Sequence, residues 1–173
     1  MLKERTPKNL LLMGVCGVGK TAVGRLLADR LGAPFLDADD LHSAGNIRKL
    51  TAGTPLTDTD RGPWLDAVAG EMLVAESRGH GMVVACSALK RVYRDRLRRA
   101  VPTLRLVHLV GPIDLVRGRL AARAGHFMSA ALLDSQVVTL EHPGVDEQPL
   151  VIDVSPALGQ VFERIEEALE HGE

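Results

Sequence analysis

Apolar residues gather in five short runs along the chain, and longer segments with a different spacing separate these runs. The runs are Leu10–Val15, Pro34–Asp37, Met82–Cys86, Leu104–Val110 and Leu150–Val154. Most of them are continuously apolar rather than alternating, which is typical of strands that are covered on both faces. We therefore expect five buried strands.

The segments between the runs repeat their apolar residues every three or four positions, which predicts amphipathic helices. The stripes are Val23, Leu26, Leu27 and Leu31; Trp64, Leu65, Val68, Met72 and Ala75; Val116 and Leu120; and Leu158, Val161, Phe162, Ile165 and Leu169. Gly32 follows the first stripe as a helix stop, and Pro112 precedes the third as a helix start. Strands that alternate with helices predict an α/β fold with a parallel sheet between two helical layers.

Two polar, turn-rich segments fit this alternation less well. One covers residues 41–60, and the other covers residues 123–149 and contains a short helix around Leu132–Leu140. Long insertions in a compact α/β unit are often binding elements or lids. We expect a single domain with a substrate-binding insertion at about 40–62 and a lid at about 123–147.

Composition narrows the class of protein. The chain has 173 residues, of which 46% are hydrophobic and 25% charged, as in an ordinary globular domain. A net charge of −1 and an aromatic content of 3% argue against nucleic acid or an anionic membrane as the main partner. Cys16 and Cys86 are too few for a disulfide framework and lack the spacing of metal ligands. Since no apolar run is long enough to span a membrane, we expect a cytoplasmic protein.

The sequence Gly14-Val-Cys-Gly-Val-Gly-Lys-Thr21 matches the phosphate-binding loop G-x-x-x-x-G-K-[ST]. In such a loop the backbone N–H groups converge on phosphate oxygens, Lys20 reaches the β- and γ-phosphates, and Thr21 holds Mg²⁺. The residues expected to bind ATP here are Gly14, Val15, Cys16, Gly17, Val18, Gly19, Lys20 and Thr21. The alternative is an accidental glycine-rich turn, but the predicted strand before the loop and the predicted helix after it favour the phosphate site.

An acidic cluster, Phe35-Leu-Asp-Ala-Asp-Asp-Leu-His42, follows the second apolar run. Phosphate loops commonly share their metal with an Asp at the end of another strand, but Met82–Cys86 ends without a carboxylate. In an extended segment Asp37 and Asp39 share one face, toward the crevice at the strand ends, while Asp40 points away and is expected to cap a helix. We expect Asp37 to hold Mg²⁺ through water. The alternative is a solvated acidic turn.

These motifs, with several others, resemble the gluconokinase family. The segments that carry the resemblance are GVCGVGKT, FLDADDLH, Asn46, GTPLTDTDRGPWL, CSALK, RLAARAGHF from Arg119 to Phe127, and SQVVTLE. The resemblance covers residues 10 to 155, with departures at Ser43, Leu50 and Thr59. It implies a three-layer P-loop kinase fold with strand order 2-3-1-4-5, and transfer of a phosphoryl group from ATP to D-gluconate, with Mg²⁺, in a cytosolic homodimer.

A small polyol acid offers hydroxyl groups, which suit carboxylate acceptors, and a carboxylate, which suits Arg or Lys. We expect it to be bound by Asp39, His42, Arg61 and Lys90, and we expect Asp39 to accept the proton of the attacking hydroxyl. Each of the other three has an alternative. Arg61 would cap the next helix or pair with a neighbouring aspartate, His42 would be a surface histidine, and Lys90 would be the first charge of a solvated basic helix.

Arg119 and Arg123 lie four residues apart, on one face of a predicted helix that leads into the lid. Their resemblance to lid arginines of related kinases implies that both contact the triphosphate; surface salt bridges are the alternative. Lys20, Asp39 and Arg123 are then the expected catalytic residues. Two rival functions stay open: a kinase of the same fold that acts on shikimate or another small hydroxy acid, and a nucleotide-binding regulator without turnover.

Overall fold

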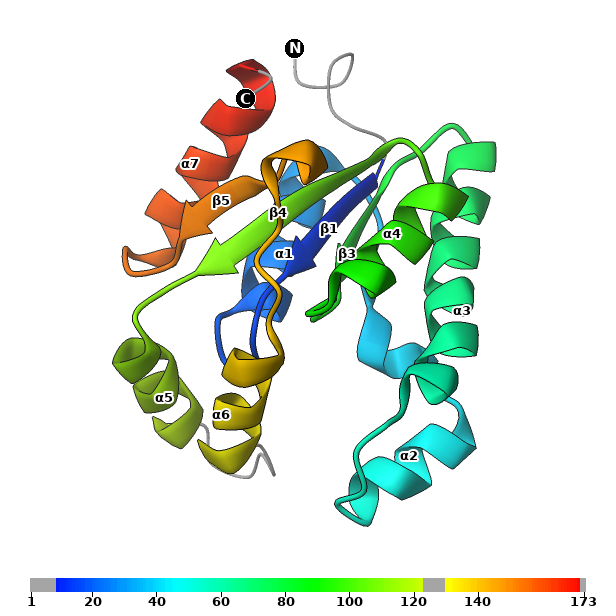
Figure 1. Ribbon diagram of the computed structural model, residues 1–173. Helices are drawn as coiled ribbons and strands as arrows, with labels where there is room; N and C mark the ends of the chain where they lie inside the picture. The colour runs from blue at the N-terminus through cyan, green and yellow to red at the C-terminus, as the bar shows by residue number, and fades with distance from the viewer. Residues whose placement is uncertain (1–8, 123–129, 172–173) are drawn as a thin grey trace.

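Five parallel strands form one sheet in the order β2-β3-β1-β4-β5 (Figure 1). The structure is a computed structural model and describes residues 9–122 and 130–171. The strands are β1 (Asn9–Met13), β2 (Phe35–Asp37), β3 (Met82–Ala85), β4 (Leu104–Val110) and β5 (Leu150–Asp153). All five predicted strands and the expected strand order are therefore confirmed.

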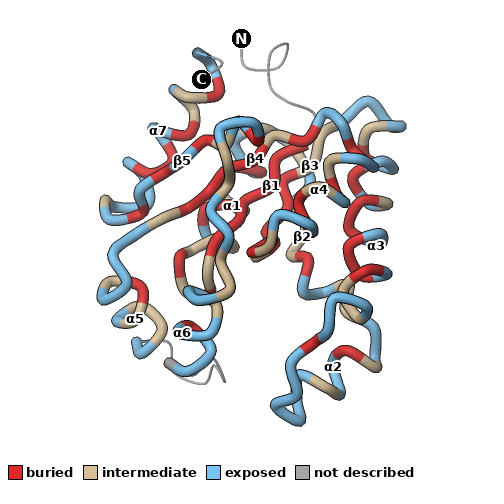
Figure 2. The backbone as a smooth tube through the Cα atoms, in the orientation of Figure 1, coloured by how far each residue is buried: buried red, intermediate tan, exposed pale blue. Residues whose placement is uncertain are grey.

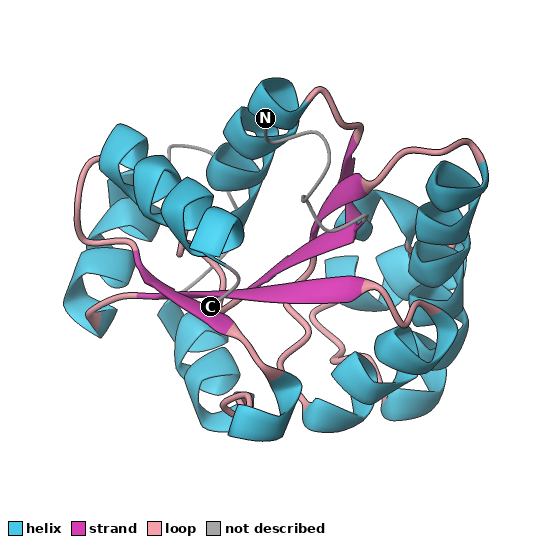
Figure 3. Ribbon diagram, turned by 90° about the horizontal axis from the view of Figure 1, so that it is seen from above, coloured by secondary structure: helices cyan, strands magenta, loops and turns pink. Residues whose placement is uncertain are grey.

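Helices cover both faces of this sheet (Figure 3). One face carries α1 (Lys20–Leu31) and α7 (Leu158–His171), and the other carries α3 (Asp58–Ser77) and α4 (Arg91–Ala100). Three further helices lie beyond the ends of the strands in Figure 1: α2 (Ala44–Thr51), α5 (Ile113–Ala122) and α6 (Ala130–Thr139). Two short 3₁₀ helices are η2 (Ala38–Leu41) and η3 (Val145–Glu147). Within the described ranges, no helix combines the length and the apolar character that crossing a membrane requires.

The sheet separates two apolar cores. Figure 2 shows that the central strands between them are buried. Leu10 and Leu12 of β1 point into the core beneath α1 and α7, whereas Leu11 and Met13 point into the core beneath α3 and α4. Because successive side chains of a strand alternate between its faces, a strand covered on both faces has mostly apolar residues. This is the physical reason for the continuous apolar runs.

The segment after β2 corrects the expected geometry of the acidic cluster. The extended backbone ends at Asp37, and η2 begins at the next residue, so Asp39 lies in a 3₁₀ turn and strand alternation does not place it. Asp37 is the N-cap of this turn, since its carboxylate accepts a hydrogen bond from the Asp39 N–H at 3.2 Å. The expected capping role of Asp40 is wrong, because Ser43 caps the next helix, α2, by accepting from the Asn46 N–H at 3.1 Å.

Candidate active site

Two glycines shape the loop between β1 and α1 at positions where a side chain would meet other atoms. Gly17 has a φ of 79°, and a Cβ on it would lie 2.5 Å from Cγ of Leu120 in α5. Gly14 has a φ of 143°, and its Cβ would lie 2.7 Å from the Leu109 carbonyl oxygen. Both positions need left-handed backbone and empty space at once. The loop therefore leads into the N-terminus of α1 in the form that binds anions.

Lys20 lies folded across this loop. Its Nζ donates hydrogen bonds to the carbonyl oxygens of Gly14 and Val15, both at 2.9 Å. Burial lowers the pKa of Lys20, and the negative charge of Asp39, together with a smaller contribution from Asp37, opposes this shift. The ammonium group thus lies close enough to Asp39 and Asp37 to feel their charges, and its hydrogen bonds within the described residues go to carbonyl oxygens.

The first turn of α1 meets the end of β2 through a direct bond. Thr21 Oγ1 donates to Asp37 Oδ2 at 3.0 Å, and Asp37 uses its other oxygen for the Asp39 N–H. A hydroxyl and a carboxylate are ligands that suit Mg²⁺, which binds proteins through one or two such groups and takes its other oxygens from water and phosphate. The structure therefore brings the two expected metal residues together, and both fit the ion.

Asp39 stands at the open side of this cluster, where 67% of its side chain is exposed. The protein around it nevertheless raises the pKa of Asp39 by desolvation, and the charge of Asp37 adds to the effect, while His42 and Lys20 oppose it. A carboxylate with a raised pKa is a stronger base than an ordinary aspartate. Asp39 is thus reachable from solvent and suited to accept a proton.

Trp64 of α3 fixes the turn that carries Asp39, a role that the sequence analysis missed because it assigned Trp64 only to an apolar stripe. Its Nε1 donates to the Ala38 carbonyl oxygen at 2.7 Å. Its ring stacks on that of His42, with centroids 4.3 Å apart and an angle of 19° between the planes. The Asn46 amide lies 3.4 Å from Nδ1 of the same histidine.

His42 is not the surface histidine that the alternative supposed, because only 8% of its side chain is exposed. Its Nε2 lies 3.7 Å from Asp39 Oδ1. Burial lowers the pKa of His42; Asp39 opposes the shift, and the charge of Arg61 adds to it. The His42 ring therefore stands next to the Asp39 carboxylate and is itself held by Trp64.

Two expected substrate residues, Arg61 and Lys90, meet around Tyr93 at the start of α4. The Arg61 guanidinium lies 5.5 Å from the centre of the Tyr93 ring, and Lys90 Nζ lies 5.7 Å from it. Lys90 pairs with Asp58 at 3.1 Å, and the Tyr93 hydroxyl donates to the same carboxylate. Arg61 also donates to the Leu56 carbonyl oxygen. Two cations therefore gather around Tyr93, and one of them, Arg61, lies close enough to His42 for its charge to add to the effect of burial in lowering the pKa of that histidine.

The start of α3 does not depend on Arg61 for its cap. Thr57 and Asp60 form a reciprocal capping box there, and Asp60 also pairs with Lys49 of α2 at 2.7 Å. The pair between Lys49 and Asp60 ties α2 to the start of α3.

Of the two expected lid arginines, the structure describes Arg119. Arg119 of α5 donates to the Val154 carbonyl oxygen at 2.7 Å and so ties α5 to the chain just after β5. Arg123 lies outside the described residues. The surface ion pair in this region belongs to a different arginine, Arg117, which meets Asp134 of α6 at 2.9 Å.

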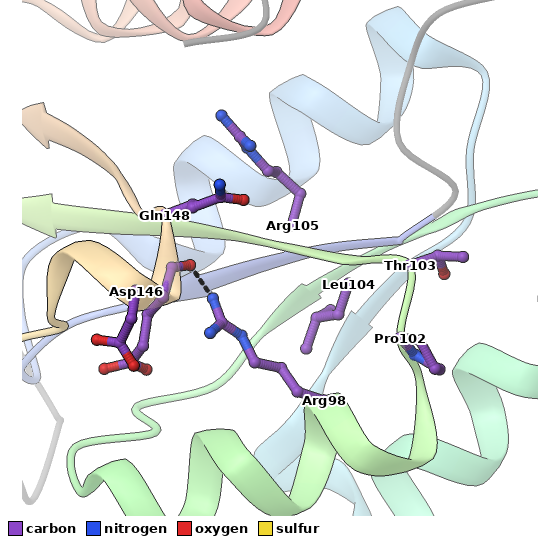
Figure 4. A pocket seen from close by; sticks show the side chains of 8 residues that line it. Arg98, Pro102, Thr103, Leu104, Arg105, Asp146 and Gln148 are labelled. Atoms are coloured by element: carbon purple, nitrogen blue, oxygen red, sulfur yellow. Dashed lines mark hydrogen bonds between the residues drawn. The ribbon is translucent and has the colours of Figure 1, made fainter.

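A separate hollow of about 350 Å³ lies between α4, the start of β4 and η3 (Figure 4). Its lining includes Arg98, Leu104, Arg105 and Gln148, and Arg98 donates to the Glu147 carbonyl oxygen. Leu104 pairs with Asn9, the first residue of β1, so this hollow opens at the amino ends of the strands. The phosphate loop follows the opposite ends, and the hollow does not belong to the same site.

Comparisons with known proteins were made for the whole chain. Residues 10–143 match the protein family described as an AAA domain. The thermosensitive gluconokinase of Escherichia coli (strain K12) is 41% identical over 163 residues, which cover 94% of this chain and 87% of that protein. A crystal structure of a gluconokinase from Sinorhizobium meliloti 1021 matches with a TM-score of 0.87 at 40% identity, over 97% of this chain and 94% of that one. A shikimate kinase from Bacteroides thetaiotaomicron shares the fold, with a TM-score of 0.67 at 20% identity over 94% of this chain and 98% of that one.

Proposed function

Since the chain belongs to the gluconokinase family, we propose that it transfers the γ-phosphoryl group of ATP to a hydroxyl of D-gluconate, giving ADP and 6-phospho-D-gluconate. One observation supports this proposal above the others. Lys20, the Thr21–Asp37 pair and Asp39 form one cluster at the carboxyl ends of β1 and β2, where a phosphate donor and a hydroxyl acceptor can meet.

The phosphate loop and the N-terminus of α1 bind the triphosphate, and Lys20 exchanges its two loop carbonyls for phosphate oxygens. Thr21 and Asp37 would hold Mg²⁺, Asp37 through water. When bound, this ion neutralises charge on the β- and γ-phosphates. Arg119 and Arg123 add positive charge next to the triphosphate from the lid side. Arg119 either breaks its hydrogen bond to the Val154 carbonyl oxygen or keeps that bond while it contacts the phosphates.

Asp39 acts on the acceptor. Its carboxylate takes the proton as the gluconate oxygen bonds to phosphorus and the bond from phosphorus to the ADP oxygen breaks. His42 and Trp64 act through Asp39, because the stacked rings and the Ala38 contact fix the turn on which it stands. Trp64 is a positioning residue, His42 both positions Asp39 and contacts the substrate, and Asp39 is the catalytic base.

Arg61 and Lys90 supply positive charge for the carboxylate of gluconate. Asp58 and Tyr93 hold Lys90 near Arg61 before substrate arrives. Arg61 and Lys90 then bind the substrate carboxylate, and Asp39 binds the reacting hydroxyl. These two separate contacts align the hydroxyl with the phosphate. We further propose that the protein acts as a cytoplasmic homodimer, as the family resemblance implies.

Coupled detection of ADP release tests the reaction. The purified chain is incubated with ATP and Mg²⁺ and with D-gluconate, shikimate or other small hydroxy acids, one at a time. We expect turnover with D-gluconate to exceed turnover with the other acids. Faster release with shikimate would favour the rival kinase, and ATP binding without acid-dependent ADP release would favour a regulator.

A further inference from the structure

One side chain of α6 reaches the backbone of the phosphate loop. The Cys16 N–H donates a hydrogen bond to Gln136 Oε1 at 2.6 Å, although the two residues lie 120 positions apart. Gln136 belongs to the segment SQVVTLE. The contact joins the described part of the expected lid to Cys16, the third residue of the phosphate loop.

This bond fixes one peptide unit from both sides. The carbonyl of Val15 and the N–H of Cys16 belong to the same planar trans peptide, so they point in opposite directions. Lys20 Nζ donates to that carbonyl at 2.9 Å, while Gln136 accepts from that N–H. Rotation of the peptide would break both bonds together. Gln136 thus sets the orientation of the carbonyl on which the Lys20 ammonium rests.

The acceptor is held in place by contacts that do not involve the loop N–H. Leu133, one helical turn before Gln136, is fully buried in the core that also contains Cys16 and Val18. Asp134 pairs with Arg117 of α5 at 2.9 Å. Beyond the helix, Glu141 accepts from the Arg91 N–H at 2.7 Å, and its own N–H donates to the Leu89 carbonyl oxygen at 2.8 Å.

These contacts place α6 across two neighbouring strand ends. Glu141 holds the chain at the loop after β3, and Gln136 reaches the loop after β1, the strand paired with β3. Removal of the Gln136 amide would therefore leave the helix seated and take away only the acceptor.

We infer that Gln136 is a positioning residue for phosphoryl transfer: it holds the Val15–Cys16 peptide and so keeps the phosphate loop in the conformation that receives the triphosphate beside Lys20. This inference rests on the proposed function for its effect on rate. Its structural part, the hold on the Cys16 N–H, is independent of any activity. Gln136 does not touch the cluster of Arg61 and Lys90, so its effect should fall on turnover rather than on gluconate binding.

Gln136→Met tests the inference, because methionine keeps the length and the helix propensity but has no strong acceptor. Val138→Met is the matched control, since Val138 lies on the same helix and is 87% exposed. Steady-state rates with ATP and D-gluconate give kcat and KM, and amide hydrogen exchange reports the Cys16 N–H without requiring turnover. Thermal unfolding shows whether each variant is folded.

For Gln136→Met we expect kcat to fall by roughly 10- to 100-fold, as for a misplaced reacting group, with the KM for gluconate within about twofold of the parent. The Cys16 amide should exchange at least about tenfold faster, because its acceptor is gone. Val138→Met should match the parent in both measurements.

Gln136→Glu separates orientation from mere filling of space. A carboxylate keeps the acceptor, so the Cys16 amide should stay protected, but its charge faces the triphosphate site and should raise the KM for ATP. An unchanged exchange rate of the Cys16 amide in Gln136→Met would overturn the inference, as would a kcat within about twofold of the parent. If the parent itself shows no gluconate-dependent ADP release, the proposed function fails, while the exchange data still decide what Gln136 holds.

Discussion

Thr21 and Asp37 are joined by a hydrogen bond of 3.0 Å between the first turn of α1 and the end of β2. The bond places a carboxylate beside the phosphate loop from a strand that β3 separates from β1. Asp37, the last residue of β2, thus brings a carboxylate to the phosphate loop, whereas β3 is followed by Cys86 and Ser87 and brings none.

The role of Asp37 in holding Mg²⁺ is tested by Asp37→Asn. The amide keeps the shape of the side chain but loses the charge, so the Mg²⁺ concentration needed for half-maximal rate should rise by about tenfold or more. Rates are measured against Mg²⁺ at saturating ATP and gluconate. Asp40→Asn, three residues along the chain at an exposed side chain of η2, is the control and should leave the Mg²⁺ requirement unchanged.

Trp64→Phe removes the indole N–H while keeping an aromatic ring against His42. The Ala38 carbonyl loses its donor, and we expect the free energy of unfolding to fall by about 1–3 kcal/mol. Because that carbonyl starts the turn that carries Asp39, kcat should fall as well, with ADP binding unchanged. Urea denaturation, steady-state kinetics and ADP titration measure the three effects. A stability loss without a change in kcat would limit Trp64 to the core.

His108 gives the protein a pH-dependent stability. It is buried in β4, its Nε2 has no hydrogen-bond partner among the described residues, and burial, with the nearby His142 and Arg94, lowers the pKa of His108 to about 4. Between pH 6.5 and 4 the unfolded chain takes up a proton that the folded protein refuses. The free energy of unfolding should therefore fall with decreasing pH across this window, by at most about 3 kcal/mol for this residue.

The corresponding measurement is urea denaturation at a series of pH values for the parent and for His108→Phe. The variant should show a shallower fall in the free energy of unfolding between pH 6.5 and 4. His80→Gln, at an exposed histidine in the turn before β3, should keep the slope of the parent. Equal slopes in the parent and His108→Phe would show that His108 is not the source.

The pair between Arg94 and Glu147 is buried on both sides, with side chains 1% and 0% exposed and an N–O distance of 2.6 Å. Glu147→Gln leaves the guanidinium without its counter-charge, and we expect a loss of about 3–5 kcal/mol in the free energy of unfolding. Asp66→Asn breaks the exposed pair with Arg96 and should cost no more than about 1 kcal/mol. Equal losses in the two variants would contradict this difference in burial.

The sequence was sufficient to predict the elements whose residues repeat with a period. The continuous apolar runs predicted the five strands, and the phosphate loop could be found because its glycines, Lys20 and Thr21 stand at fixed spacing. The strand order came from the family resemblance, not from the spacing. Helix α2 was missed within the polar insertion because Ile47 and Leu50, at 52% and 48% exposed, do not form a core-facing stripe.

The contacts that position the site were beyond sequence reasoning for a different reason. The bond between Cys16 and Gln136 and the stacking of His42 on Trp64 join residues 120 and 22 positions apart, and no local pattern marks such pairs. Asp39 was assigned to the cleft by strand alternation, yet the backbone leaves the extended conformation at η2. The candidate role of Asp39 therefore depends on a turn that only the fold reveals.

The central claim is that Asp39 is the base for the gluconate hydroxyl, and Asp39→Asn tests it most directly. The amide keeps the shape and one acceptor oxygen but removes the charge and the basicity. The measurement is kcat with D-gluconate at saturating ATP and Mg²⁺, together with ADP affinity as a check on the nucleotide site. We predict that kcat falls by roughly 10²- to 10⁴-fold, the range for a lost general base, while ADP affinity stays within about threefold. A kcat within about tenfold of the parent would contradict the account and would show that Asp39 is not the base.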